Sequence, residues 1–222
     1  MEEIRKIIRK VLSESFIEED YPEMFKADEF KTLTSFSERI RYCESFLERI
    51  SSGSSRIVYK IDNEKVLKLA KNKKGIAQNA EEVKFSKDDY IKYLFAKVYD
   101  HDPNYLWVEM QLAEKMTETK FAQITMFNFK DYSAVLRERY YAAVDHTKGS
   151  QPADVHPDIR EMIYESELYS DVADYMSGYE IPVGDLTRTS SYGIVDGDEI
   201  VLVDFGLTKE VAADHYGYNA AE

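Results

Sequence analysis

Two aspartates at the ends of a predicted β-hairpin are the side chains of this sequence best suited to chemistry. Residues 192–203 contain two runs rich in β-branched and apolar residues, and Asp196-Gly197 between them is a strong signal for a tight turn. Asp185 precedes the hairpin and Asp204 follows it directly. Because an antiparallel hairpin returns to the edge where it began, we expect both carboxylates at one end of a sheet. Two such carboxylates can hold a divalent cation and orient a nucleophile, which is what phosphoryl transfer requires; otherwise they are solvated acids on a surface hairpin.

A lysine within an apolar strand is the second candidate. Residues 56–61 and 65–70 predict a hairpin, and Lys68 lies inside its second strand. Its side chain points either to solvent or into a cleft where an anion neutralises it. Residues 77–84 predict a helix that carries Glu81 and Glu82, and either carboxylate could pair with Lys68. We prefer Glu82; if neither pairs, the two glutamates form a solvated helix face.

Small residues open this hairpin, and two further strands follow it. Backbone N–H groups at Gly53, Ser54 and Ser55 could approach phosphate oxygens without side-chain obstruction, although a flexible linker has the same composition. Residues 93–99 and 105–112 predict strands, so the chain would leave a β-rich lobe near residues 110–114. Backbone groups there, at Gln111 and Ala113, could bind the edge of an adenine base.

Helical patterns dominate both ends of the chain. An amphipathic helix is predicted over residues 2–13, and a Ser35/Glu38 capping box predicts a second helix whose apolar positions run through Cys43 to Ile50. Cys43 lies on that apolar face, which indicates a packed core thiol. After residue 115, helices are predicted over residues 134–144 and, capped by Asp158, over residues 158–178.

Composition limits the partners and the compartment. The net charge of −13 over 222 residues argues against a nucleic-acid backbone or an anionic membrane as the main partner. A single cysteine excludes an internal disulfide and favours a reducing compartment. No apolar run reaches the roughly 20 residues that span a bilayer, and the first residues lack a signal-peptide core. We therefore expect an acidic, soluble, cytoplasmic protein.

The order of these features resembles the protein-kinase-like fold. A lysine on a strand, a glutamate on the next helix, an aspartate loop, a hairpin and Asp204-Phe205-Gly206 follow one another between about Ser51 and Thr208. The Val-Gly-Asp-Leu sequence at 183–186 is similar to the His-Gly-Asp loop of aminoglycoside and choline phosphotransferases. The run Lys-Lys-Gly-Ile-Ala-Gln-Asn-Ala-Glu-Glu at 73–82 also resembles small kinase-like proteins encoded by bacteriophages.

The resemblance implies an α+β, two-lobed architecture. Residues 1–50 would form an N-terminal helical extension, residues 51–114 a small β-rich N-lobe, and residues 115–222 a minimal, mostly helical C-lobe that contains the hairpin and Asp204-Phe205-Gly206.

The resemblance also implies ATP and Mg²⁺ and gives the candidate residues their roles. Lys68 would grip the nucleotide phosphates, and Glu82 would steady it. Asp185 would accept or orient the proton of the acceptor hydroxyl. Asp204 would bind the metal ion, with Ser190 in the position of the asparagine that supplies a second ligand.

Three functions remain open at this point. The first is ATP-dependent phosphoryl transfer to a hydroxyl of a protein or small molecule. The second is a pseudokinase that binds a nucleotide or a partner, motivated by Val183 in place of histidine, Ser190 in place of asparagine and the short stretch after Gly206. The third is transfer of a nucleotide by the same residues. The acceptor, the partner and the oligomeric state are not specified by the sequence.

Overall fold

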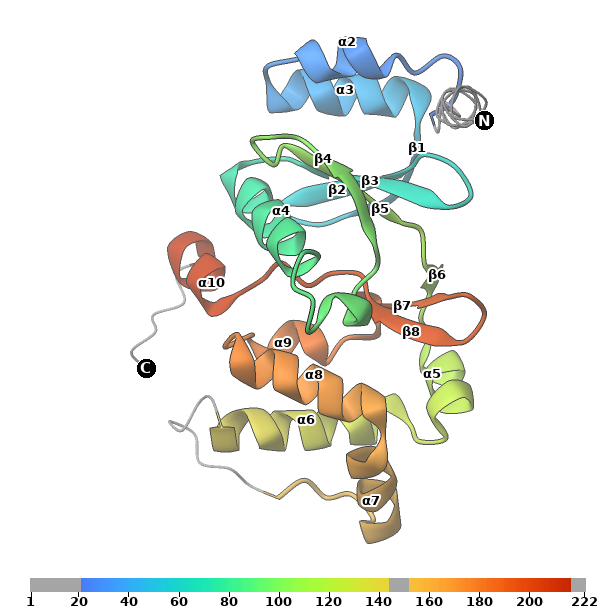
Figure 1. Cartoon of the computed structure of the whole chain (residues 1–222), viewed down its shortest axis with the longest axis vertical. Helices are drawn as coiled ribbons and strands as arrows, with labels where there is room; N and C mark the ends of the chain where they lie inside the picture. Colours follow the sequence, from blue (N-terminus) through green and yellow to red (C-terminus); the bar gives the residue numbers. More distant parts are fainter. Residues whose placement is uncertain (1–20, 144–151, 217–222) are drawn as a thin grey trace, which may run out of the picture.

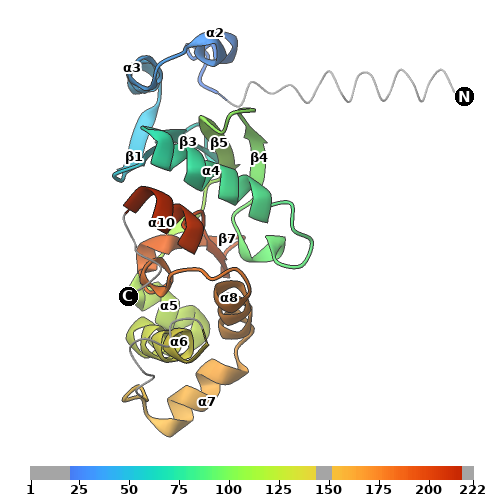
Figure 2. The same cartoon turned by 90° about the vertical axis from the view of Figure 1, so that its left-hand side faces the viewer.

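The computed structural model describes residues 21–143 and 152–216, which form a mixed α+β fold. The predicted helix over residues 2–13 and the end of the predicted helix 134–144 lie outside this part of the chain. Within the described residues there are two antiparallel sheets, with strand orders β1-β2-β3-β5-β4 and β6-β7-β8 (Figure 1). Helices cover the larger sheet from both sides, and the smaller sheet joins it to a mostly helical half (Figures 1 and 2).

The strands of the larger sheet are β1 (Glu48–Ser52), β2 (Arg56–Lys60), β3 (Lys65–Ala70), β4 (Val98–His101) and β5 (Trp107–Gln111). Helices α2 (Ala27–Thr32), α3 (Phe36–Phe46), α4 (Lys73–Phe85) and the 3₁₀ turn η1 (Lys92–Leu94) accompany it. The remaining elements are β6 (Glu114–Lys115), α5 (Glu118–Thr125), α6 (Phe129–Ala143), α7 (Pro157–Glu165), α8 (Glu167–Gly178), α9 (Val183–Leu186), η3 (Thr189–Ser191), β7 (Tyr192–Val195), β8 (Glu199–Leu202) and α10 (Lys209–Tyr216).

Alternation along the central strand β3 separates two hydrophobic cores. Leu67 and Leu69 point to the outer face of the sheet, where they pack in one core with Phe30 and Cys43 of the α2–α3 pair. Val66 belongs to the other core, which includes residues of α4, α6, α8 and the small sheet. Because side chains alternate along a strand, Lys68 points to the same inner face as Val66. The sheet therefore delivers Lys68 to the side that faces α4 and the helical half.

The capping box that predicts α3 is present, but the helix is shorter than expected. Ser35 Oγ accepts a hydrogen bond from the Glu38 N–H, and the Ser35 N–H donates to the Glu38 carboxylate at 3.1 Å. The predicted continuation to Ile50 is wrong, because Leu47 adopts an extended conformation and residues 48–52 pair with β2 as a strand. Ile50 is thus an exposed strand residue. Burial raises the pKa of the Cys43 thiol to about 12, as expected for a core cysteine.

The predicted β7–β8 hairpin is confirmed. Asp196 and Gly197 both have positive φ, at 51° and 100°, as a tight two-residue hairpin turn requires. The strand predicted over residues 105–112 is also present as β5. The strand predicted over residues 93–99 is wrong at its start, because residues 92–94 form the η1 turn and β4 begins only at Val98.

The long helix predicted over residues 158–178 is two helices. Ser166 is extended, accepts a hydrogen bond from the Tyr169 N–H, and so ends α7 and caps α8. The expected cap at Asp158 is wrong, since the helix begins after His156 with Pro157 in its first turn. Helix α8 packs along α6, and α10 lies beside α4 (Figure 2).

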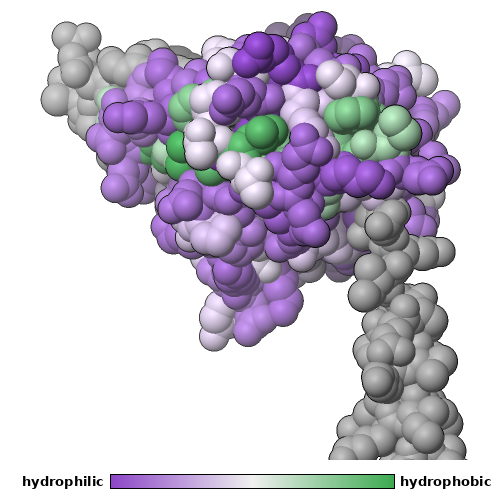
Figure 3. All heavy atoms as spheres, turned by 90° about the horizontal axis from the view of Figure 1, so that it is seen from above, coloured by the Kyte–Doolittle hydropathy of each residue, from purple (hydrophilic) through white to green (hydrophobic). Residues whose placement is uncertain are grey.

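The face of the molecule that α2 and α3 form is mostly polar. Viewed from the end formed by α2 and α3, hydrophilic side chains dominate, and apolar ones appear only in small patches (Figure 3). None of the helices described here combines the length and the apolarity that a bilayer crossing demands.

Candidate functional site

A buried ion pair between β3 and α4 forms the centre of the candidate site. Lys68 Nζ lies 2.9 Å and 3.0 Å from the two carboxylate oxygens of Glu82. The Glu82 side chain has no solvent exposure, and that of Lys68 is 7% exposed. Glu82 faces the sheet because it falls on the buried stripe of α4, at helical spacing from Gly75, Gln78 and Asn79.

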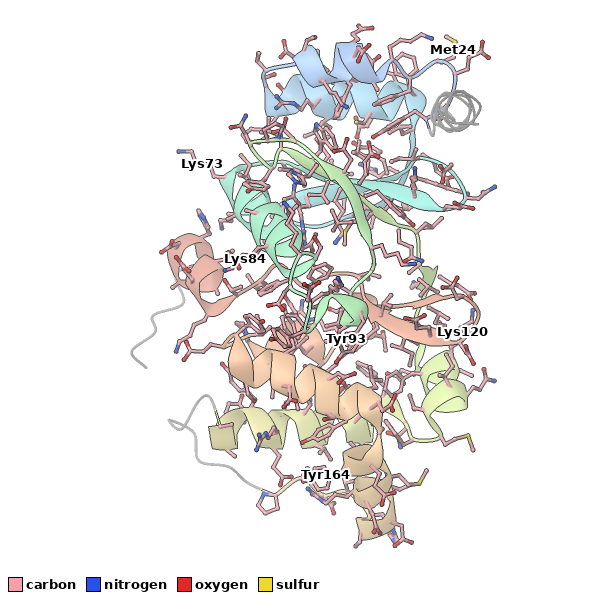
Figure 4. All side chains as sticks on the ribbon, viewed as in Figure 1. Met24, Lys73, Lys84, Tyr93, Lys120 and Tyr164 are labelled. Atoms are coloured by element: carbon pink, nitrogen blue, oxygen red, sulfur yellow. The ribbon has the colours of Figure 1, made fainter. Side chains whose placement is uncertain are left out.

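The adjacent Glu81 points elsewhere. It pairs with Lys84 at 3.0 Å, and the Lys84 side chain is 65% exposed. Figure 4 shows Lys84 and Lys73 on the outer side of α4, away from the sheet. The structure therefore places Glu82, and not Glu81, against Lys68.

The Asp204-Phe205-Gly206 segment lies directly against this pair. Lys68 Nζ donates to the carbonyl oxygen of Val203, and the Phe205 N–H donates to Glu82 Oε1 at 3.4 Å. The Phe205 ring stacks on Phe95 with 4.2 Å between centroids. A Cβ on Gly206 would lie 2.2 Å from the Gln78 carbonyl oxygen, so only glycine allows this approach to α4. The tripeptide is thus fixed to the helix that carries Glu82.

Arg56, which the sequence analysis did not single out, joins the two acidic residues. Its guanidinium pairs with Glu82 Oε1 at 2.8 Å and with Asp204 Oδ1. It also donates to Asn79 Oδ1 at 3.4 Å. The Arg56 side chain is 8% exposed, whereas that of Asp204 is 48% exposed. Two cations and two carboxylates therefore balance one another around the centre of the site.

This arrangement shifts the pKa of two of its members. Burial lowers the pKa of Lys68, and the neighbouring Arg56 charge lowers it further, against the opposing effect of Glu82. Burial acts to raise the pKa of Asp204, but the positive charges of Arg56 and Lys68 outweigh it, and the pKa lies below its usual value. Asp204 is therefore ionised at neutral pH.

Asp185 lies near Asp204, on the short helix α9. Its side chain is 22% exposed and pairs with Arg188 at 3.2 Å. Burial raises the pKa of Asp185, and the negative charge of Asp204 raises it further. Tyr192 at the start of the hairpin holds α9 in place, because its hydroxyl donates to the Leu186 carbonyl oxygen at 2.7 Å. The two carboxylates are therefore close enough for the charge of Asp204 to act on Asp185.

Ser190, the predicted second metal ligand, is exposed and lines a surface depression with Arg137 and Thr187. The next residue, Ser191, is buried, and its carbonyl oxygen accepts the Val203 N–H at 2.8 Å. The described residues contain no group of three or more histidine, cysteine or acidic side chains suited to a metal ion. Arg56 pairs with Asp204 Oδ1, so a Mg²⁺ ion at that oxygen would have to displace the guanidinium.

The predicted phosphate loop is a tight connection between β1 and β2. Its side towards α4 is anchored: Lys71 Nζ donates to the Gly53 carbonyl oxygen at 2.9 Å, and Ser55 Oγ donates to Gln78 at 2.6 Å. Asn72 Nδ2 donates to the Ser54 carbonyl oxygen at 3.1 Å. The loop therefore lies next to the start of α4 and immediately before Arg56.

The predicted adenine-binding linker follows β5. The Gln111 N–H donates to the Lys97 carbonyl oxygen at 2.8 Å, and the Leu112 N–H donates to that of Glu64 at 2.6 Å. Ala113 packs closely on the β7–β8 hairpin. A Cβ added to Gly193 of β7 would lie only 2.5 Å from the Cβ of Ala113. The backbone N–H groups of residues 111 and 112 are thus engaged within the protein, and base binding at this linker remains a prediction.

Among known proteins, this chain has a distant similarity in structure and no detectable similarity in sequence. No protein-family model matches the sequence, and no curated protein is significantly similar to it. A solved structure of a choline/ethanolamine kinase family protein from Mesorhizobium loti is similar at 13% identity with a TM-score of 0.36. The match covers 78% of this chain and 65% of that protein's chain.

Proposed function

We propose that this protein is a kinase-like phosphotransferase that binds a nucleoside triphosphate between the five-stranded sheet and the helical half. The observation that carries this proposal is the buried Lys68–Glu82 pair in contact with the backbone on either side of Asp204. A lysine on the third strand, held by a glutamate of the following helix beside an Asp-Phe-Gly segment, is the arrangement by which protein kinases position ATP phosphates. We propose ATP as the donor.

The second part of the proposal concerns the acceptor. Asp185 is partly exposed, and its pKa is raised by burial and by the Asp204 charge, which suits a group that accepts a proton from a hydroxyl. We propose a hydroxyl of a protein or small molecule as the acceptor. The net charge of −13 disfavours nucleic acid and anionic membranes as partners. The roles proposed for Lys68 and Asp185 use these two side chains alone, and Arg56 pairs with Asp204 Oδ1 beside them.

The test is Asp185→Asn. We expect phosphoryl transfer from γ-labelled ATP to fall by about 10²–10⁴-fold, because the amide cannot take the proton of the acceptor. The increase in melting temperature produced by ATP should remain, since ATP binding depends on Lys68. Transfer at the wild-type rate in this variant would contradict the role of Asp185. Incorporation of α-label in place of γ-label would show nucleotide transfer instead.

A second candidate is a pseudokinase that binds nucleotide without turnover. The observation that favours it is the Arg56–Asp204 ion pair, which engages the aspartate that kinases use for metal binding. ATP-dependent stabilisation without transfer of either label to any protein or small hydroxyl compound supplied would support this candidate. Robust turnover would exclude it.

A further inference from the structure

Arg56 pairs with Asp204, the residue that corresponds to the metal-binding aspartate of kinases in the resemblance. It opens β2, and its side chain points to the inner face of the sheet, as Val58 and Lys68 do in the observed register. From there its guanidinium reaches across to Asp204, which follows it by 148 positions in the sequence. The same guanidinium contacts Glu82 at 2.8 Å. Arg56 thus links the sheet, α4 and the segment after β8.

The position of Arg56 is fixed by its surroundings. Its carbonyl oxygen accepts the Gly53 N–H at 2.9 Å, which closes the turn that precedes it. The neighbouring Ser55 is anchored to Gln78 of α4. On the other side, Asn79 Oδ1 accepts from the guanidinium, and the Asn79 Nδ2 is itself bound to the Tyr105 carbonyl oxygen at 2.9 Å. The backbone and the guanidinium of Arg56 are therefore both held by hydrogen bonds, which keep its positive charge next to Asp204.

The charge that Arg56 supplies is the one that a triphosphate site needs beside Asp204. An uncompensated carboxylate at that position would repel the phosphates, and protein kinases neutralise it with a metal ion. A guanidinium remains protonated at every physiological pH and pairs well with carboxylates and phosphates. With Arg56 in place, Asp204 already has its cation.

We propose that Arg56 replaces the divalent cation of this site, so that a nucleoside triphosphate binds without metal and removal of the guanidinium leaves Asp204 free to hold a metal ion together with the phosphates. This inference rests on the proposed nucleotide-binding function and specifies its ionic requirement. A divalent ion that binds Asp204 through Oδ1 would have to displace Arg56.

The experiment compares ATP binding in EDTA and in Mg²⁺ for the wild type and for Arg56→Gln, by calorimetry and by thermal shift. We expect wild-type affinity to be the same in both conditions. Arg56→Gln should bind ATP about tenfold or more weakly in EDTA, because a charged hydrogen-bonding group is lost, and Mg²⁺ should restore its affinity. In the presence of ATP, Mn²⁺ should raise the melting temperature of Arg56→Gln above its value in EDTA and leave that of the wild type unchanged.

Arg49→Gln is the matched control. Arg49 lies on the adjacent strand β1, where it pairs with Glu44 at 3.4 Å and is 57% exposed. Its loss removes the same charge from the same sheet and should leave both ATP affinity and its independence of metal unchanged. Arg56→Lys, which keeps the charge, should retain binding in EDTA and provides a second variant if Arg56→Gln does not fold.

The outcomes separate this inference from the function on which it rests. Wild-type binding that requires Mg²⁺ would overturn the inference and leave the proposed function standing. Equal metal dependence in the wild type and Arg56→Gln would overturn it as well. Absence of ATP binding by the wild type in both EDTA and Mg²⁺ would contradict the proposed function and the inference together.

Discussion

At the scale of single residues, the site depends on Glu82. Its Oε1 forms an ion pair with Arg56 and accepts hydrogen bonds from Lys68 and, at 3.4 Å, from the Phe205 N–H. Two cations in a buried position are tolerated only when nearby carboxylates and hydrogen bonds compensate them. Glu82 therefore orients the lysine and also makes the burial of Arg56 and Lys68 compatible with folding.

This role predicts a large difference between two adjacent glutamates. Glu82→Gln should lower the free energy of unfolding by about 3–5 kcal/mol, because it leaves buried cations without a partner. Glu81→Gln, which removes only the pair with the exposed Lys84, should change it by less than about 0.5 kcal/mol. Urea denaturation of the two variants measures both values. Similar stability of the two would contradict the assignment of Glu82.

At the scale of elements, helix α4 positions the site. Its buried polar side chains face the sheet, and two glycines let other segments come close to its backbone. A Cβ on Gly75 would lie 2.3 Å from the Ser55 carbonyl oxygen, and one on Gly206 would lie 2.2 Å from that of Gln78. The first approach brings the β1–β2 loop against the start of the helix. The second brings the Asp-Phe-Gly segment against its middle. The predicted phosphate loop and the Asp-Phe-Gly segment are thus positioned by the same helix.

Gly206→Ala tests this packing. The added methyl group would collide with the backbone of α4, and we expect a loss of about 1–3 kcal/mol in the free energy of unfolding. Nothing lies within 4 Å of a Cβ on Gly178, the last residue of α8, so Gly178→Ala should be neutral or stabilising by up to about 1 kcal/mol. Thermal and urea denaturation distinguish the two. An unchanged stability of Gly206→Ala would show that the segment is free to move away from α4.

At the scale of the whole molecule, the five-stranded sheet has a core on each face, and residues 21–46 close the outer one. Part of this closure is polar. The Tyr21 hydroxyl donates to Glu109 Oε1 of β5 at 2.5 Å, and Glu109 is buried. Burial raises the pKa of Glu109, against the opposing effect of the Tyr21 hydrogen bond. The attachment of the N-terminal helices to the sheet therefore contains an acid that is costly to ionise.

This acid predicts a pH dependence of stability. Because the pKa is higher in the folded than in the unfolded state, the folded protein binds the proton more tightly, and stability should fall as pH rises from the ordinary glutamate value of 4.5 through the raised value. Glu109→Gln should show a smaller decline, and the part that remains comes from other acids with a raised pKa, such as Asp185. Glu23→Gln, at an exposed position, should retain it. Unfolding free energies measured at several pH values test this; parallel curves for wild type and Glu109→Gln would contradict it.

Local sequence signals determined much of the framework. The Asp196-Gly197 turn fixed the β7–β8 hairpin because both residues tolerate positive φ. The apolar run around Lys68 predicted β3. The Ser35/Glu38 capping box predicted the start of α3 from two residues only three positions apart. These features depend on neighbours in the chain, so the sequence alone was sufficient to locate them.

Only the tertiary structure decided which charges meet at the site. Glu81 and Glu82 are adjacent in the sequence, so both were candidates for the pair with Lys68. The packing of α4 on the sheet turns Glu82 towards Lys68 and leaves Glu81 paired with Lys84. Arg56 escaped notice because its significance depends on the register of β2 with β3 and on contact with Asp204. Contacts across such long separations arise from the joint packing of sheet, helix and hairpin, for which no local pattern in the sequence carries a signal.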